Sequence, residues 1–134
     1  IAWDYNIAWG LAEHGNAFSP EGFVIHGDSS DHLPFWWNIL WENNKFNSSL
    51  KRRYIALRKS VLRNDNIGQL IEQFENTLSA HQSLNFKKWP LMGKKIWPNK
   101  HKSQSHKEEL DLLKTWIEQR LIWLDQQWGM NATE

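Results

Sequence analysis

The first ten residues place one acidic side chain inside an apolar run. The run is Ile1-Ala-Trp-Asp-Tyr-Asn-Ile-Ala-Trp-Gly10, and its carboxylate is Asp4. A carboxylate in a buried apolar segment is costly to desolvate unless it is paired, hydrogen-bonded or bound to a metal. Asp4 is therefore either a metal ligand or a structural carboxylate that accepts hydrogen bonds from backbone amides. Because the run begins at residue 1, we expect the chain to be cut from a longer protein, with the partners of Asp4 upstream.

A second group of potential metal ligands lies further along, in a turn-rich stretch. His26, Asp28, Asp31 and His32 occur in the sequence HGDSSDH, and both residue types bind Zn²⁺ or Mn²⁺ in proteins. Their spacing matches no known metal motif, and Gly, Ser and Asp are common in ordinary loops. We therefore favour a loop without metal at this position.

Charge is divided unevenly along the chain. Residues 1–44 contain six acidic residues and no Lys or Arg, whereas residues 45–102 contain thirteen Lys and Arg and three acidic residues. The basic part either faces the acidic part within the fold, with Arg53 and Arg58 as partners of the acids, or faces an anionic ligand. We expect no nucleic-acid partner, because the pI of about 8.2 is below the range typical of nucleic-acid-binding domains.

Composition limits the classes of protein to consider. The 134 residues suffice for a single domain, 1–134, and ten Trp residues supply large side chains for its core. With no Cys, the chain can form no disulfide, thiolate metal site or Cys nucleophile. No apolar run reaches the roughly 18 residues that a membrane-spanning helix needs.

Apolar periodicity predicts a mostly α fold with a short extended N-terminal segment. We expect an extended segment and loop over 1–32, helices over 33–128 and a tail over 129–134. Apolar stripes at helical spacing predict helices from Pro34, over 44–63, from 67 to about 81, and between Ser105 and Gly129.

Local signals refine the ends of these helices. Asn64 to Asn66 is predicted to supply the N-cap of the third helix. Residues 84–104 are predicted to be irregular, because two Trp-Pro steps discourage helix at each Trp. In the last helix, Arg120 and Asp125 are predicted to be a surface charge pair or partners inside the fold, with no catalytic role.

Five groups of residues, in order along nearly the whole chain, resemble the C-terminal half of the spore-coat-protein-H (CotH) kinase-like family. The family signature contains a Trp-Asp-aromatic-Asp segment followed by a small residue and Gly. It continues with two helices that begin at an aromatic PFWW segment, an aromatic connection and a closing helix. The matching residues are Trp3-Asp4-Tyr5-Asn6 with Gly10; Pro34-Phe-Trp-Trp37, Phe46, Leu50, Arg53-Tyr54 and Leu57-Arg58; Asn85-Phe86, Trp89-Pro90 and Gly93; Trp97-Pro98; and Glu109, Leu113-Lys114, Trp116-Ile117, Arg120-Leu121 and Trp123-Leu-Asp125.

The resemblance implies the helical C-lobe of an atypical kinase fold. It places Asp4 at the position of the kinase Asp that holds Mg²⁺ against the nucleotide phosphates. Mg²⁺ or Mn²⁺ with ATP would then be the cofactors of the longer protein, since Mg²⁺ binds carboxylate oxygen and keeps several waters. The loop from His26 to His32 would follow the metal ligand as a kinase activation segment does, and would contact a substrate.

The resemblance also implies a location and a partner. Members of the family are mostly spore-coat or secreted proteins, and some phosphorylate other proteins. It therefore implies a secreted or cell-surface protein with a protein substrate. We further expect the upstream half of the longer protein to be a partner of this chain. Without that half, an apolar face should be exposed and the isolated chain should self-associate.

Two departures separate the chain from the family pattern. Asn6 stands where the signature has its second acid, so its amide carbonyl is either an uncharged metal ligand or a structural hydrogen-bond acceptor. The nucleotide-gripping Lys and the catalytic-loop Asp are expected upstream of residue 1. We therefore predict that this chain alone binds no cofactor and is not an active kinase. The alternative is a non-catalytic, pseudokinase-like helical scaffold or protein-interaction domain.

Overall fold

The computed structural model describes residues 8–26 and 33–129. Within these ranges it contains the helices α1 (Phe35–Glu42), α2 (Asn44–Arg58), α3 (Asn64–Lys88) and α4 (His106–Trp128). Two short 3-10 helices, His14–Asn16 and Val24–His26, precede them. The described residues form no strand, and an isolated β-bridge joins Ala12 to Asn99. The predicted mostly α fold is confirmed, while most of the predicted extended segment lies outside the described residues.

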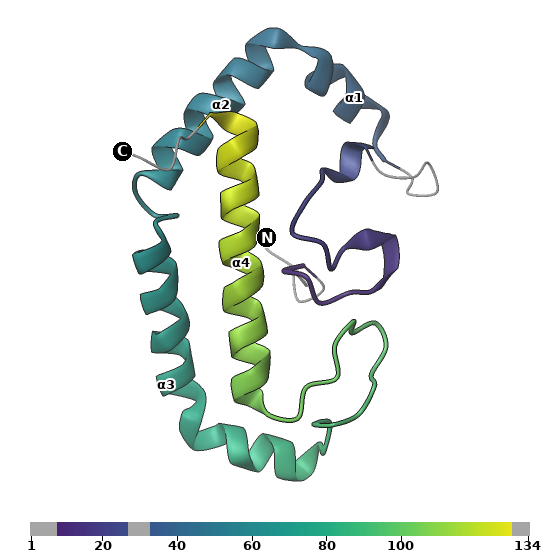
Figure 1. Ribbon diagram of the computed structural model, residues 1–134, viewed down its shortest axis with the longest axis vertical. Helices are drawn as coiled ribbons and strands as arrows, with labels where there is room; N and C mark the ends of the chain where they lie inside the picture. The colour runs from purple at the N-terminus through teal and green to yellow at the C-terminus, as the bar shows by residue number, and fades with distance from the viewer. Residues whose placement is uncertain (1–7, 27–32, 130–134) are drawn as a thin grey trace.

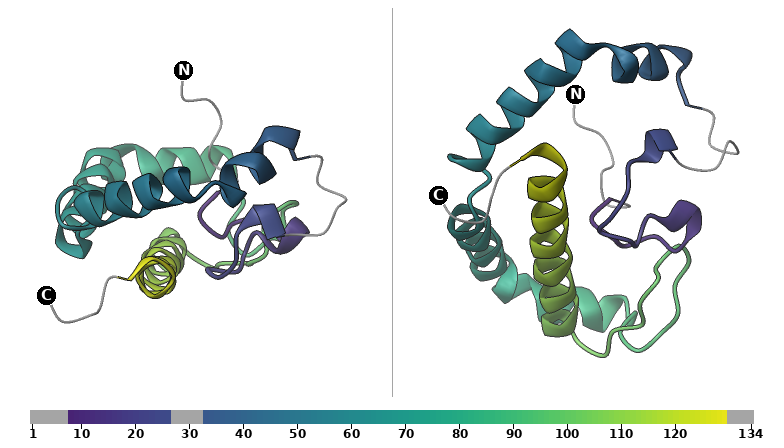
Figure 2. Two further views of the ribbon diagram at one scale, coloured as in Figure 1. Left: turned by 90° about the horizontal axis from the view of Figure 1, so that it is seen from above. Right: turned by 45° about the horizontal axis from the view of Figure 1, so that its top comes forward.

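Helix α4 lies in the middle of the molecule, and the other described elements are arranged around it (Figure 1). Helix α3 runs antiparallel to α4 on one side, and α2 passes near the C-terminal end of α4. Residues 8–26 and the connection 89–105 lie on the side of α4 opposite to α3 (Figures 1 and 2). The helices thus form an open arrangement around α4 rather than a closed bundle.

Polar caps mark several helix ends. Asn43 Oδ1 accepts hydrogen bonds from two backbone amides in the first turn of α2, both at 3.0 Å. Ser105 Oγ accepts from the Glu108 amide at 3.2 Å and begins α4. Gly129 ends α4 in the left-handed conformation, at φ 78°, which glycine adopts without a steric penalty. The predicted start and end of the last helix are confirmed.

Three predicted features of the middle helices are wrong. Helix α2 ends at Arg58 rather than near residue 63, because the chain turns over residues 59–63. Helix α3 continues to Lys88 rather than ending near residue 81, since no helix breaker occurs before Pro90, which disfavours helix at the preceding residue. The N-cap position of α3 is Arg63, whose side chain makes no capping hydrogen bond. Asn66 instead donates to the carbonyl of Ser60 at 2.6 Å.

Little apolar side-chain surface is buried. Among the described residues, the buried hydrophobic ones are Ala12, Tyr54 and Leu121. The expectation that the Trp residues lie mainly in the core is therefore wrong for several of them, because an open arrangement covers each helix on one side. The exposed large hydrophobic residues are Trp9, Val24, Phe35, Trp36, Trp37, Ile39, Phe46, Val61, Leu70, Phe74, Leu78, Leu84, Trp89, Leu91, Trp97 and Ile122.

An aromatic cluster joins the N-terminal part to the helices. The Phe23 ring lies 4.9 Å from the Trp41 ring of α1, measured between centroids, and 4.7 Å from the Trp123 ring of α4. Trp128 lies 5.5 Å from Phe23 and 4.7 Å from Tyr54 of α2. Aromatic pairs at these separations stabilise a fold beyond the area that they bury, so this cluster joins α1, α2 and α4 through apolar contacts.

A polar network links α2 to α4. Tyr54 Oη donates to Asp125 Oδ1 at 2.6 Å, and Arg58 Nε lies 3.1 Å from both carboxylate oxygens of Asp125. The prediction that Arg58 pairs with the acidic N-terminal part is thus wrong, because its carboxylate partner is on α4. The sequence also predicts that Arg120 and Asp125 are a surface charge pair or partners inside the fold. They form no surface pair with each other, and each binds a different segment inside the fold.

The network predicts a pH dependence of stability. Burial, with the hydrogen bond to Asp125, raises the pKa of Tyr54 above its ordinary value of 10.0. Because the folded-state pKa is the higher one, the stabilisation is complete below pH 10 and is lost as pH rises toward the folded-state value. We expect Tyr54→Phe to lower the free energy of unfolding by about 1.5–3 kcal/mol at neutral pH. The variant should also lack the loss of stability that ionisation of Tyr54 causes above pH 10.

Urea unfolding of the wild type and Tyr54→Phe, repeated from neutral pH to above pH 10, measures both effects. The free-energy difference between the two proteins should shrink as the pH rises above the ordinary tyrosine value. A difference that stays constant over the whole range would contradict the proposed ionisation.

Candidate functional site

Most of the predicted ligand residues lie outside the part of the chain that the structure describes. This applies to Asp4 and Asn6, and to the loop residues 27–32 with their two aspartates and one histidine. His26 is described: it is exposed, and its ring lies 5.1 Å from the Trp41 ring. The structure therefore informs on the Asp4 site only through residues 8–22, the described segment that follows it.

The segment begins with a tight turn that packs against α4. Trp9 and Gly10 both have positive φ, 66° and 80°. Gly10 is buried, and a Cβ atom there would lie 2.2 Å from Cδ1 of Trp116. The Trp116 ring also meets the Trp9 ring edge to face at 6.2 Å. The apolar run of residues 1–10 ends in glycine because no other residue fits between the turn and α4.

Two side chains of α4 hold the rest of the segment by its backbone. Trp116 Nε1 donates to the Phe18 carbonyl at 2.9 Å. Arg120 Nη1 donates to the carbonyls of Pro20 and Gly22 at 2.9 and 2.7 Å. Burial lowers the pKa of Arg120 below its ordinary value, but a guanidinium stays protonated at neutral pH. Its charge strengthens both hydrogen bonds.

Sequence reasoning missed these two roles. Trp116 and Arg120 both belong to the closing-helix group that resembles the CotH family, and that grouping was the available signal. Their partners, however, are backbone carbonyls nearly a hundred residues away. No pattern of residue types reveals an acceptor that every residue carries.

The connection 89–105 holds the same segment from another side. The amide of Lys100 donates to the Leu11 carbonyl at 2.7 Å, and the amide of Glu13 donates to the Pro98 carbonyl at 2.9 Å. Lys95 Nζ adds an ion pair with Glu13 Oε2 at 2.6 Å. The segment after Asp4 is therefore fixed by both α4 and the connection.

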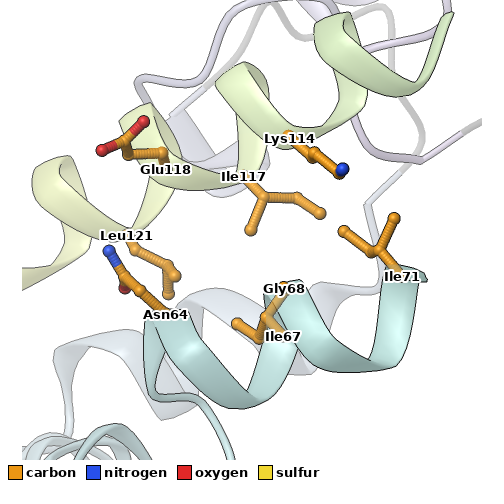
Figure 3. Close-up of a pocket in the computed structure, with 8 residues that line it drawn as sticks. All are labelled: Asn64, Ile67, Gly68, Ile71, Lys114, Ile117, Glu118 and Leu121. Carbon is orange, nitrogen blue, oxygen red and sulfur yellow. The ribbon is translucent and has the colours of Figure 1, made fainter. Parts of the chain in front are cut away.

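A groove of about 240 Å³ opens between α3 and α4 (Figure 3). Apolar side chains line most of it, and Lys114 and Glu118 of α4 lie at its edge. No group of three or more His, Cys, Asp or Glu that could hold a metal is found among residues 8–26 and 33–129. The apolar lining side chains are Ile67, Ile71, Ile117 and Leu121. The groove therefore offers an apolar surface with one basic and one acidic side chain at its edge.

Comparison with known proteins identifies the family. The family model described as CotH kinase protein matches residues 1–124 of this 134-residue chain. The chain belongs to the CotH kinase protein family. No curated protein gives a significant match, and no solved structure does.

In the described part of the chain, no helix is both long enough and apolar enough to cross a membrane.

Two glycine variants test the contact between the turn and α4. Gly10 and Gly22 both have positive φ, but nothing lies within 4 Å of a Cβ atom built on Gly22. Gly22→Ala should lower the free energy of unfolding by about 1–2 kcal/mol, because of its backbone conformation alone. Gly10→Ala should cost about 1–3 kcal/mol more, because the added methyl group overlaps the Trp116 ring.

Urea unfolding gives the two free energies, and hydrogen exchange locates the damage. In Gly10→Ala the amides of Glu13 and Lys100 should exchange faster than in Gly22→Ala, because their hydrogen bonds tie the displaced segment to the connection. Equal costs for the two substitutions would show that Trp116 does not restrain the turn.

Proposed function

We propose that this chain is part of an atypical kinase of the CotH family that carries out metal- and ATP-dependent phosphoryl transfer to a protein. The observation that carries the proposal is the family match over residues 1–124, which includes the Trp3-Asp4 motif. The chemistry of the motif supports it, since a carboxylate next to an amide carbonyl provides the oxygen ligands that Mg²⁺ and Mn²⁺ prefer.

In this proposal Asp4 and Asn6 hold the metal ion. When bound, the ion would neutralise charge on the nucleotide phosphates. The chain's own contribution is positioning: Trp116 and Arg120 fix residues 8–22, which directly follow the ligand segment. Phosphoryl transfer depends on such positioning, because misplacement of a ligand by about 1 Å can cost about a hundredfold in rate.

The remaining machinery is proposed to lie in another part of a longer protein. Within residues 1–134 we assign neither the Lys that grips the nucleotide nor the Asp that orients the acceptor hydroxyl. We propose that the chain by itself is inactive and binds no cofactor. The family's spore-coat and secreted members support a secreted or cell-surface location for the longer protein.

A second candidate function is a non-catalytic, pseudokinase-like scaffold. The observation that favours it is Asn6, which stands where the family signature has an acid. Loss of one carboxylate lowers the negative charge that attracts a divalent ion. In this case the helical part would serve protein interaction alone.

Calorimetric titration of Mg²⁺ and ATP into the longer protein separates the two candidates. Binding by the wild type should be lost in Asp4→Ala and retained in Asp65→Ala, which removes an exposed carboxylate of α3. Asn6→Asp should bind the metal more tightly, because it restores the second charge. Absence of metal and nucleotide binding in the wild type would favour the scaffold.

The exposed apolar surface supports two proposed partners. The accessible surface of the chain is 10539 Å², whereas a compact monomer of 16.0 kDa exposes about 7,400 Å². The difference of about 3,000 Å² on this one chain corresponds to about 6,000 Å² counted over two partners, which is the size of a large obligate interface. We propose that the rest of the longer protein covers this surface, and that copies of the isolated chain associate through it.

Light scattering over a concentration series tests the self-association. The isolated chain should have a mass above that of one copy, and Phe35→Ser with Ile39→Ser should lower it, because these α1 side chains are 79% and 61% exposed. Asn38→Ser, on the same helix, is the matched polar control and should leave the mass unchanged. A strictly monomeric wild type at all concentrations would contradict the proposal.

A further inference from the structure

One continuous stretch of the chain carries no negative charge. Residues 76–107 contain no Asp or Glu but seven Lys and three His. The stretch comprises the C-terminal half of α3, the connection 89–105 and the first residues of α4. These parts form one edge of the molecule, at the bottom of the view in Figure 1. We call residues 76–107 the basic edge.

The lysines of the basic edge divide into two groups. Lys95 and Lys107 are held by carboxylates, Glu13 and Asp111, both at 2.6 Å. The other five lysines form no ion pair with an acidic residue of the described ranges, and two of them lie over aromatic rings, Lys88 over Trp89 and Lys100 over Phe18. The remaining exposed lysines are Lys87, Lys94 and Lys102.

Five acidic side chains lie next to the basic edge in the sequence or the fold, Glu13, Glu75, Glu108, Glu109 and Asp111, and three of them are engaged in ion pairs or hydrogen bonds with named groups. The Glu13 and Asp111 carboxylates bind the two lysines named above. Glu108 Oε2 accepts from the Gln104 amide at 2.7 Å, as part of the N-terminal end of α4. The edge therefore presents net positive charge, which is complementary to an anionic surface.

Large apolar side chains stand exposed among these charges. Trp97 is 75% exposed and Trp89 is 58% exposed, and Leu84 and Leu91 are also exposed. Trp rings are favoured at the headgroup level of a bilayer, and Lys side chains can extend their charged ends from that level into water. Exposed aromatic and aliphatic side chains between lysines therefore fit a membrane interface.

We propose that the basic edge is a peripheral binding surface for an anionic lipid bilayer. Trp89, Leu91 and Trp97 would enter the headgroup layer, and Lys94 and Lys102 would attract anionic headgroups. A single-stranded nucleic acid is the rival ligand, but aliphatic side chains such as Leu84 and Leu91 offer no face on which bases stack. This surface goes beyond the proposed phosphoryl transfer and requires neither Asp4 nor a nucleotide.

Co-sedimentation with vesicles tests the proposal. The chain should bind vesicles of phosphatidylcholine with about one third phosphatidylglycerol and leave pure phosphatidylcholine unbound, with affinity that falls as salt is added. Lys94→Glu with Lys102→Glu should weaken binding by at least about 25-fold, which is about fivefold for each lost lysine.

Two matched variants make the result specific to the basic edge. Lys45→Glu with Lys51→Glu changes the net charge equally, but on exposed residues of α2, and should leave binding within about threefold. Trp89→Ala should weaken binding severalfold, whereas Trp36→Ala, on an exposed ring of α1, should not.

Several results would overturn the proposal. One is equal loss of binding in the two double-lysine variants, which would reflect net charge alone. Another is equal binding to neutral and anionic vesicles. A third is binding to a single-stranded oligonucleotide without binding to vesicles, which would assign the basic edge to nucleic acid. Circular dichroism of each variant verifies that the helices are intact, and the salt series on the wild type depends on no substitution.

Discussion

The contact of the Asp125 carboxylate with Tyr54 and Arg58 is the interaction on which the helical arrangement depends. Little apolar surface is buried, so the crossing of α2 and α4 relies on groups with defined geometry. The side chains of Arg58 and Asp125 are 13% and 19% exposed, against 59% and 75% for the Arg63 and Asp65 pair. Water and salt therefore screen the first pair less, and it contributes more to stability than the surface pair does.

Helix α4 serves as the common support for the rest of the molecule. Three of its residues bind two different parts of the chain: Trp116 and Arg120 hold the segment after Asp4, and Asp125 holds α2. A rigid helix is a suitable support, because its side chains keep their relative positions. A substitution in α4 can therefore affect the proposed metal site without contacting it.

The exposed surface has two parts with different physical character. Exposed apolar side chains on α1 and α3, such as Phe35, Ile39 and Phe74, suit burial against protein. The basic edge combines Trp and Leu with lysines, and suits an interface that is both anionic and partly apolar. The apolar surface of α1 and the basic edge can be occupied at the same time, since the two lie at opposite ends of the molecule (Figure 1).

The candidate site could be predicted from the sequence only in part. The Trp3-Asp4 motif and the order of the later motifs identified the family, because these depend on residue types and spacing alone. The requirement for glycine at position 10 could not be explained in advance. It arises from the Trp116 ring, which the fold brings against the turn.

The sequence by itself determined the helices, the starts of α1 and α2, and both ends of α4. Helix formation depends on side chains within about one turn of each other. The apolar face of α2, the N-cap Ser105 and the end of α4 at Gly129 could therefore be predicted from the sequence. Tertiary structure alone decided which groups meet. Arg58 reached a carboxylate 67 residues away rather than the acidic N-terminal part. A charge attracts any opposite charge, and only the packing of the helices selects one partner among several.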